Sequence, residues 1–382
     1  MQVNIGPFWM KSFRSGHAKK ITKFRNGRQC PQLAHRLEGG LMNFSIKSLI
    51  LASAMAITAI PAMAQDTLRA TWTDPNTPQT APVSAYMNVL QASAYRFSGG
   101  ELDIELFPNG QLGDQRAMVQ QVARGSLHFA NIASGVLASL YFPELGIIDM
   151  PFLFKSRAHF RATMSYDNPF IKDLLDEVAA ETGIRILSLH PYGFRNMTTK
   201  DTAIHSPADM VGLRMRTMEI VPHQRMMESL GATAVPIPYL ELYTSLQTGV
   251  VDGQENPPSN IILQRFYQVQ GHMAETQHVM TVGAVLTNEE WYQSLTDDQR
   301  QALLHADAEA SYAHDGIGSI QDLLGVQEIR DQGVEVYTPT PVEMAEFREA
   351  TVGPSREWAE EEYGKEFVDG FFAHMESFDA DF

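Results

Sequence analysis

Cysteine is almost absent from this sequence: the only one in its 382 residues is Cys30. Cys30 precedes a predicted cleavage site after residue 64, so the chain that remains after cleavage contains no cysteine. This excludes a disulfide, a thiolate nucleophile and a cysteine metal site from that chain. The 318 residues from 65 to 382 must fold around a core alone, and their number suits two lobes better than one.

Catalytic motifs are missing as well. The chain after residue 64 has no H-E-x-x-H, no G-x-S-x-G and no Gly-rich phosphate loop. Its histidines are scattered, and acidic pairs such as Asp297-Asp298 are explained by the negative charge that helix starts favour. We therefore assign no catalytic residue, no metal ligand and no cofactor.

Basic residues are scarce outside the N-terminal segment. Residues 1–64 hold nine of the 29 Lys and Arg but one of the 45 Asp and Glu, which leaves 20 basic and 44 acidic residues and a formal charge of −24. This charge argues against nucleic acid and against anionic membrane surfaces as partners. A locally positive ligand site remains possible, because distant charges are screened over about 8–10 Å.

The N-terminal segment has the order of a signal peptide. A short basic start at 42–47 is followed by a mostly apolar run of twelve residues, 49–60, and by Ala-Met-Ala at 62–64. This order predicts a signal peptide over 42–64 with cleavage after Ala64, and the run is too short to span a bilayer. We interpret the basic residues 1–41 as an upstream segment from a misplaced gene start, with a genuine extended leader as the alternative.

From residue 67 on, strand and helix periodicities alternate, which predicts an α/β fold. The first half has expected strands at 68–72, 101–107, 127–131 and 184–190, and expected helices at 83–97, 115–123 and 169–181. Further on, Ser206, Thr296 and Thr340 each begin a capping box. The box at Thr296 opens a long helical pattern toward Ile329.

The stretch from Gly212 to Pro257 reads as strand, helix, strand, helix, strand. Apolar and basic residues alternate up to Arg216, and two amphipathic segments end at Gly231 and Gly249. In a parallel sheet fragment of this kind, Arg216 and Asn256 would lie on one edge, where ligands bind in open α/β sheets. The guanidinium of Arg216 suits a carboxylate, because its two parallel N–H donors match the two oxygens. Arg214 lies on the same strand face and is the alternative.

Several motifs together carry a family resemblance. Gly-Leu-Arg-Met-Arg at 212–216, Pro-Ile-Pro-Tyr-Leu-Glu-Leu-Tyr-Thr-Ser-Leu-Gln-Thr-Gly at 236–249 and Val-Asp-Gly-Gln-Glu-Asn-Pro at 251–257 resemble the extracytoplasmic solute-binding subunits of TRAP transporters, the DctP family. Phe-Pro-Asn-Gly-Gln-Leu-Gly-Asp-Gln-Arg-Ala-Met at 107–118 and Asp-Met-Pro-Phe-Leu-Phe at 149–154 fit the same family.

The resemblance implies a two-lobed periplasmic binding protein fold of type II, with a long helix spanning both lobes. It places residues 65–193 plus 282–321 in lobe I and residues 194–281 plus 322–382 in lobe II. The chain would cross between lobes around Tyr192-Gly193-Phe194, and we expect the lobes to close on a ligand by a hinge there and at 281–282.

The resemblance also implies a set of ligand contacts. Arg216 matches the family's carboxylate clamp and Arg195 a second arginine in the cleft, although Arg195 could instead form a surface or interlobe salt bridge. Asn256 could orient a carboxylate or hydroxyl, or cap a helix. Tyr239 matches an aromatic ligand contact, or packs in the core with Tyr243. The remaining contacts that it implies are Glu219, Ser134 and Gln115.

Asn76 is a further candidate, because the loop after the first strand should face the cleft. The alternative for Asn76 is a turn residue between two prolines.

The function implied is that of a periplasmic subunit that captures an organic acid, such as a C4-dicarboxylate or a sugar acid, and delivers it to the small and large TRAP membrane subunits. Glu219 would repel an anionic ligand but accept hydrogen bonds from hydroxyl groups, which favours a hydroxylated acid. The alternatives are a binding protein of an ABC importer or a sensor, and a periplasmic lyase or hydrolase.

Overall fold

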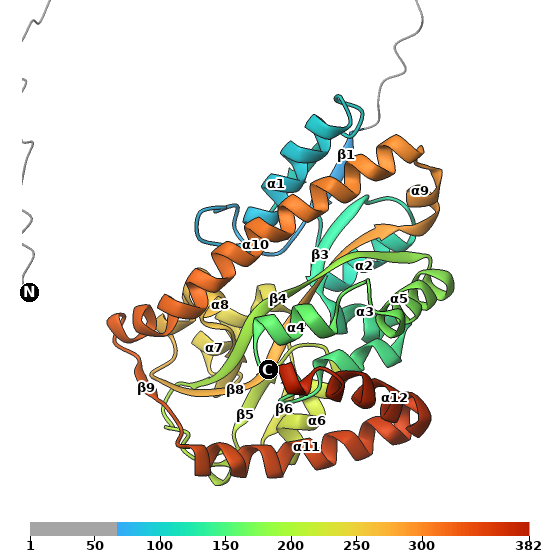
Figure 1. Cartoon of the computed structure of the whole chain (residues 1–382). Coiled ribbons are helices and arrows are strands. Elements are labelled where there is room, and N and C mark those ends of the chain that lie inside the picture. The colour runs from blue at the N-terminus through green and yellow to red at the C-terminus, as the bar shows by residue number, and fades with distance from the viewer. Residues whose placement is uncertain (1–66, 382) are drawn as a thin grey trace, which may run out of the picture. The chain divides into compact units, whose positions relative to one another are not determined.

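A pair of long antiparallel strands runs through the whole sheet. The computed structural model describes residues 67–381, so the expected signal peptide and upstream segment lie outside the described residues. Strand β4 (Ile184–Thr199) pairs with β8 (His272–Asn288) from Ile184 opposite Asn288 to Thr199 opposite His272. The sequence predicted a strand only to residue 190, but β4 continues to Thr199 and stays paired with β8, with shifts of register on the way (Figure 1).

The first half of the sheet has the order β2-β1-β3-β8. Strands β1 and β2 are parallel, β1 and β3 are parallel, and β3 is antiparallel to β8. The elements of this half are β1 (Leu68–Thr71), α1 (Pro82–Phe97), β2 (Ile104–Phe107), α2 (Gln115–Ala123), β3 (Phe129–Ala133), α3 (Ser134–Tyr141), η1 (Pro143–Asp149), α4 (Arg157–Thr163) and α5 (Pro169–Thr182). Each expected helix of this half is present, with bounds within a residue of those predicted.

The second half has the order β8-β4-β7-β5-β6, and strand β9 pairs with β8 off this path. Its elements are η2 (Pro207–Met210), β5 (Arg214–Thr217), α6 (Val221–Ser229), β6 (Thr233–Pro236), η3 (Tyr239–Glu241), α7 (Leu242–Thr248), β7 (Gly253–Asn256), α8 (Pro258–Leu263), η4 (Phe266–Gln268) and β9 (Glu335–Tyr337). Strand β5 is parallel to both β6 and β7, so the predicted strand–helix–strand–helix–strand unit is confirmed. Gly249 follows α7 at φ 72°, a conformation that glycine adopts without strain.

The C-terminal helices connect the two halves. They are α9 (Glu289–Ser294), α10 (Asp297–Asp331), α11 (Pro341–Tyr363) and α12 (Lys365–Glu376), followed by the short η5 (Asp379–Asp381). The predicted capping box is formed, since Thr296 accepts from the Gln299 amide and Gln299 accepts from the Thr296 amide. Helix α10 runs beside α1 of the first half and also packs against α8 of the second (Figure 1).

The end of the chain returns to the first half. Phe371 of α12 lies against Phe170 of α5, and the His374 ring bonds the carbonyl of Thr163. The sequence expectation grouped residues 322–382 with the second lobe. In the structure, α12 shares a core cluster with residues of the first half such as Ile171.

Candidate functional site

Arg216 is buried at the end of β5. Its side chain is 1 % exposed, and its Nε and Nη2 donate to the carbonyl of Ile237 at 2.9 and 2.7 Å. Nη1 has no hydrogen-bond partner among the described residues. Burial, together with the nearby charge of Arg195, lowers the pKa of Arg216 to about 10, so the guanidinium stays charged at neutral pH. The Ile237 carbonyl thus fixes the Nε and Nη2 edge of the guanidinium, and Nη1 remains available to donate a hydrogen bond to another group.

Arg214 lies at the start of the same strand and points outward. Its Nη2 is 2.6 Å from Oδ1 of Asp252, and both side chains are partly exposed. The sequence alone left Arg214 and Arg216 as alternatives for the inward-facing arginine. The structure shows that Arg216 is the buried one and Arg214 the exposed one.

Arg195 is fully buried in an ion pair with Glu255, the residue before Asn256. Its Nε bonds one carboxylate oxygen and its Nη2 lies 2.8 Å from the other, while Nη1 donates to Oγ1 of Thr281 at 2.8 Å. Glu255 is 0 % exposed. Burial alone would raise the pKa of Glu255, but Arg195 and His223 outweigh it and hold the pKa well below the usual range. Arg195 therefore forms a salt bridge, but it is a buried one with Glu255 and not the surface or interlobe bridge that we considered.

Two histidines extend this buried cluster. His223 of α6 has its Nδ1 3.7 Å from Glu255 and its Nε2 3.5 Å from Asp149, and all three side chains are 0 % exposed. His278 of β8 has its Nε2 3.3 Å from Glu255. Burial lowers the pKa of His278, whereas for His223 the two carboxylates outweigh burial and raise the pKa.

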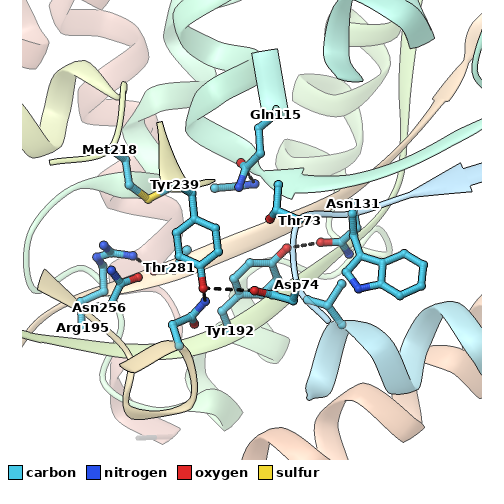
Figure 2. Close-up of a pocket in the computed structure, with 14 residues that line it drawn as sticks. Thr73, Asp74, Gln115, Asn131, Tyr192, Arg195, Met218, Tyr239, Asn256 and Thr281 are labelled. Atoms are coloured by element: carbon cyan, nitrogen blue, oxygen red, sulfur yellow. Dashed lines mark hydrogen bonds between the residues drawn. The ribbon is translucent and has the colours of Figure 1, made fainter. Parts of the chain in front are cut away.

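A polar cavity lies between the two halves of the sheet, and we call it the first compartment. Figure 2 shows its lining. Its hydrogen-bonding residues are Thr73, Asp74, Gln115, Asn131, Tyr192, Arg195, Tyr239, Asn256, Asn260 and Thr281. These residues come from both halves of the sheet, so both halves are needed to form the cavity lining.

A second compartment adjoins the first. Arg216 and Glu219 line it, and the two compartments share Thr73, Gln115, Met218 and Tyr239. Glu219 lies near Arg116 of α2, with Oε1 3.8 Å from Nε. Together the two compartments form one candidate cleft.

Tyr239 joins the two sides of the cleft. Its hydroxyl donates to Oδ1 of Asp74 at 3.1 Å and accepts from Nδ2 of Asn260 at 2.7 Å (Figure 2). Asp74 follows β1 of the first half, and Tyr239 and Asn260 belong to the second. Leu240, next to Tyr239, covers Gly110 of the first half.

Two more predicted residues line the cleft. Gln115, the first residue of α2, accepts the backbone N–H of Ala133 at 2.9 Å. Asn256 ends β7, is 3 % exposed and donates to the side chain of Gln254. The structure thus brings Arg216, Arg195, Asn256, Tyr239, Glu219 and Gln115 around the cleft.

Ser134 and Asn76 do not line either compartment. Ser134 begins α3, is 0 % exposed, and donates to the carbonyl of Val282 at 3.1 Å. Asn76 is exposed, and its Oδ1 accepts from Ser84 and Asn88 of α1 at 2.7 and 2.6 Å. Both side chains hold local structure in place.

Some cleft residues were not identified from the sequence. Asp74 lies in the loop that was expected to face the cleft, but we chose Asn76 there. Tyr192, Asn131 and Thr281 come from strands whose pairing was not predicted. Within residues 67–381, no helix has the length and apolar character to cross a membrane, and no cluster of His, Cys, Asp and Glu has the arrangement of a metal site.

The chain belongs to a family of bacterial solute-binding proteins. Residues 74–361 match the DctP family, described as bacterial extracellular solute-binding protein, family 7. A solute-binding protein of Verminephrobacter eiseniae is 32 % identical over 304 residues, which are 80 % of this chain and 88 % of that protein. The C4-dicarboxylate-binding periplasmic protein DctP of Rhodobacter capsulatus is 28 % identical over 86 % of this chain and 95 % of its own length.

Solved structures agree with this assignment. The sugar acid binding protein of Advenella mimigardefordensis, solved in complex with galactonate, superposes with a TM-score of 0.76 at 28 % identity, covering 81 % of this chain and 98 % of that one. The fold is therefore the two-lobed one of TRAP periplasmic solute-binding proteins, as predicted.

Proposed function

We propose that this protein is the periplasmic solute-binding subunit of a TRAP transporter, and that it holds an organic acid in the cleft and delivers it to the small and large membrane subunits. The observation that carries the ligand class is the buried Arg216, whose Nη1 lacks a partner among the described residues. Removing a cation from water is costly unless an anion compensates it, and a ligand carboxylate would supply that charge. Relatives named for C4-dicarboxylates and for sugar acids support the same class.

We further propose that six of the predicted residues contact the ligand or hold those that do. Arg216 binds the carboxylate, and Glu219, Gln115, Tyr239 and Asn256 face the ligand. Arg195 has a different role, because Glu255 and Thr281 already take four of its five N–H donors. We assign it to holding β4, β7 and β8 together beside the cleft.

The lobes would meet where β4 and β8 lose their regular register. Pro191 pairs with Val282 and Gly193 with Thr281, so Tyr192 is an extra residue on β4. Bulges bend a strand locally, and Gly193 has φ 139°, which few other residues adopt. This supports the expected lobe crossings near 192–194 and 281–282 and a hinge at that point.

Export across the inner membrane is part of the proposal. The family description is extracellular, and residues 42–64 have the order of a signal peptide. Mass spectrometry of the exported protein should find a chain that begins at Gln65. A mature chain that retained residues 1–41 would contradict this.

A ligand screen followed by transport tests the function. Thermal unfolding with a panel of organic acids should reveal a binder, since a ligand at 100 times its Kd stabilises by about 2.7 kcal/mol. Uptake of that labelled acid by cells with the membrane subunits should then require both this protein and a sodium gradient. Uptake that persisted without the gradient would favour an ABC importer, and conversion of the acid by the purified protein would reveal an enzyme.

A further inference from the structure

Asp74 is a buried carboxylate that faces the first compartment. It is 6 % exposed and lies in the loop after β1. Oδ1 accepts hydrogen bonds from Tyr239 at 3.1 Å and from Gln264 at 3.4 Å. Within the described part of the chain, Oδ2 accepts none, and no cationic side chain pairs with Asp74. A carboxylate held out of water with so few partners is costly, so a ligand donor would relieve it.

Among residues 67–381, no unpaired Lys or Arg lines the first compartment around Asp74. The cation of the first compartment, Arg195, is neutralised by Glu255. Arg216 lines only the second compartment. The second compartment therefore has the buried cation Arg216, with Glu219 near Arg116 beside it, and the first compartment has Asp74 without a cation. Burial raises the pKa of Asp74, although the bonds from Tyr239 and Gln264 oppose this shift.

The other polar groups around Asp74 are neutral. Asn131, Asn260, Thr73 and Thr281 present amide and hydroxyl groups that can both donate and accept. Such groups match ligand hydroxyls, which also donate and accept. A ligand carboxylate at this end would instead meet Asp74, and two carboxylates in one buried site repel each other.

We propose that Asp74 is a specificity determinant, and that it selects monocarboxylates with a hydroxylated tail and rejects dicarboxylates. The proposal rests on the proposed function, in which Arg216 binds the ligand's single carboxylate. The tail then extends into the first compartment, where one of its hydroxyl groups donates to Oδ2 of Asp74. The other hydroxyls bond the neutral amide and hydroxyl side chains.

Two matched pairs of acids test this selection. Galactonate and galactarate differ only in one terminal group, a primary alcohol or a carboxylate, and erythronate and meso-tartrate differ in the same way. Calorimetry on the wild type should show that the monocarboxylate of at least one pair binds at least about 30-fold more tightly than its dicarboxylate, the scale expected when buried charges conflict. Hexanoate, which has the carboxylate without hydroxyls, should bind weakly.

The variant Asp74→Asn keeps the shape and removes the charge. It should lower the affinity for the preferred monocarboxylate by about tenfold, because a hydrogen bond to a charged acceptor is lost. It should also improve binding of the matching dicarboxylate. Both effects lower the ratio of the affinity for the monocarboxylate to the affinity for the dicarboxylate. Asp173→Asn, an identical change on the exposed face of α5, should leave both affinities unchanged.

The outcomes separate this proposal from the proposed function. Dicarboxylates that bound the wild type as well as their partners, and lost binding in Arg216→Ala, would overturn the role of Asp74 and keep the solute-binding function. Tighter binding of 6-aminohexanoate than of the hydroxy acids would overturn the hydroxyl selection, because Asp74 would then pair with an ammonium. If no acid of a broad panel bound, the proposed function itself would fail.

Discussion

At the scale of single residues, burial distinguishes the two arginines of β5. Arg216→Ala should weaken binding of the preferred acid by about 30-fold to several thousandfold, because losing one partner of a buried charge pair costs about 2–5 kcal/mol. Arg216→Lys keeps the charge but loses the planar fork, so it should also bind poorly. Calorimetry on these variants checks the assignment.

Arg214→Ala is the matched control. This side chain pairs with Asp252 at the surface, so its removal should change the affinity little. If Arg216→Ala bound within about threefold of the wild type while Arg214→Ala lost binding, the clamp would belong to Arg214.

His223 gives the fold a pH dependence with a definite sign. Its pKa is raised in the folded protein, so the stability that it contributes is present below the unfolded pKa of about 6.5 and is lost as the pH rises through the folded pKa. Asp149 and Glu255 face its ring, with Arg195 and His278 on the other side of Glu255. Urea unfolding of the wild type and His223→Gln should therefore differ most below pH ~6.5 and converge at higher pH.

His278 provides the opposite sign in the same cluster. Its pKa is lowered in the folded protein, so protonation at acidic pH favours the unfolded state. Relative to His278→Gln, the wild type should lose stability as the pH falls below about 6.5. A pH-independent difference for both variants would mean that neither histidine titrates in this range.

Site residues differed in how far the sequence could identify them. Arg216 could be predicted, because a strand pattern and a family motif place it at a sheet edge. The pairing of Arg195 with Glu255 could not, since 60 residues separate them and no local pattern links them. The sequence suggested Asn76 in this loop but not Asp74, because only the folded loop shows that Asp74 lines the cavity while Asn76 bonds α1.

At the scale of elements, the β4 bulge positions a cleft residue against a glycine of β8. A Cβ on Gly283 would lie 1.9 Å from the Tyr192 ring, which lines the first compartment and bonds Asn131. Gly283→Ala should push this ring from its place, destabilise the protein by about 1–3 kcal/mol and weaken ligand binding. Denaturant unfolding and calorimetry measure the two effects.

Gly316 of α10 is the control for this change. Apart from its chain neighbours and the nearby backbone of α10, no atom of the described residues lies within 4 Å of a Cβ placed there, so Gly316→Ala should raise helix stability by up to about 1 kcal/mol and leave binding unchanged. Adding Tyr192→Ala to Gly283→Ala should remove most of the clash. Additive losses in the double variant would show that the ring and the glycine are not coupled.

Local sequence patterns predicted individual helices and helix caps better than they predicted which strands pair in the sheet. Helix α2 and the capping box of α10 follow from turn residues and periodicity, which are legible over a few positions. The ladder between β4 and β8 is buried along most of its length and joins segments about 90 residues apart, so neither strand alternates in a way that reveals its partner.

At the scale of the whole binding unit, the cleft is lined from both halves of the sheet, and Tyr239 bonds Asp74 across it. An unliganded protein lacks the ligand's contacts and leaves Asp74 and Arg216 uncompensated, so we expect it to populate a more open arrangement that the ligand closes through a hinge at the β4 bulge.

Small-angle scattering tests this closure. The radius of gyration of the mature wild type should fall when the preferred acid is added at 100 times its Kd, a concentration that contributes about 2.7 kcal/mol to the liganded state. Arg216→Ala at the same acid concentration should give a curve close to that of the free protein, because it leaves the carboxylate without its main partner. Tyr239→Phe should bind more weakly and close less completely, because it removes the hydroxyl that links Asp74 to Asn260. Identical wild-type curves with and without saturating acid would instead mean that the lobes are already closed, and the ligand would then have to enter without a hinge motion.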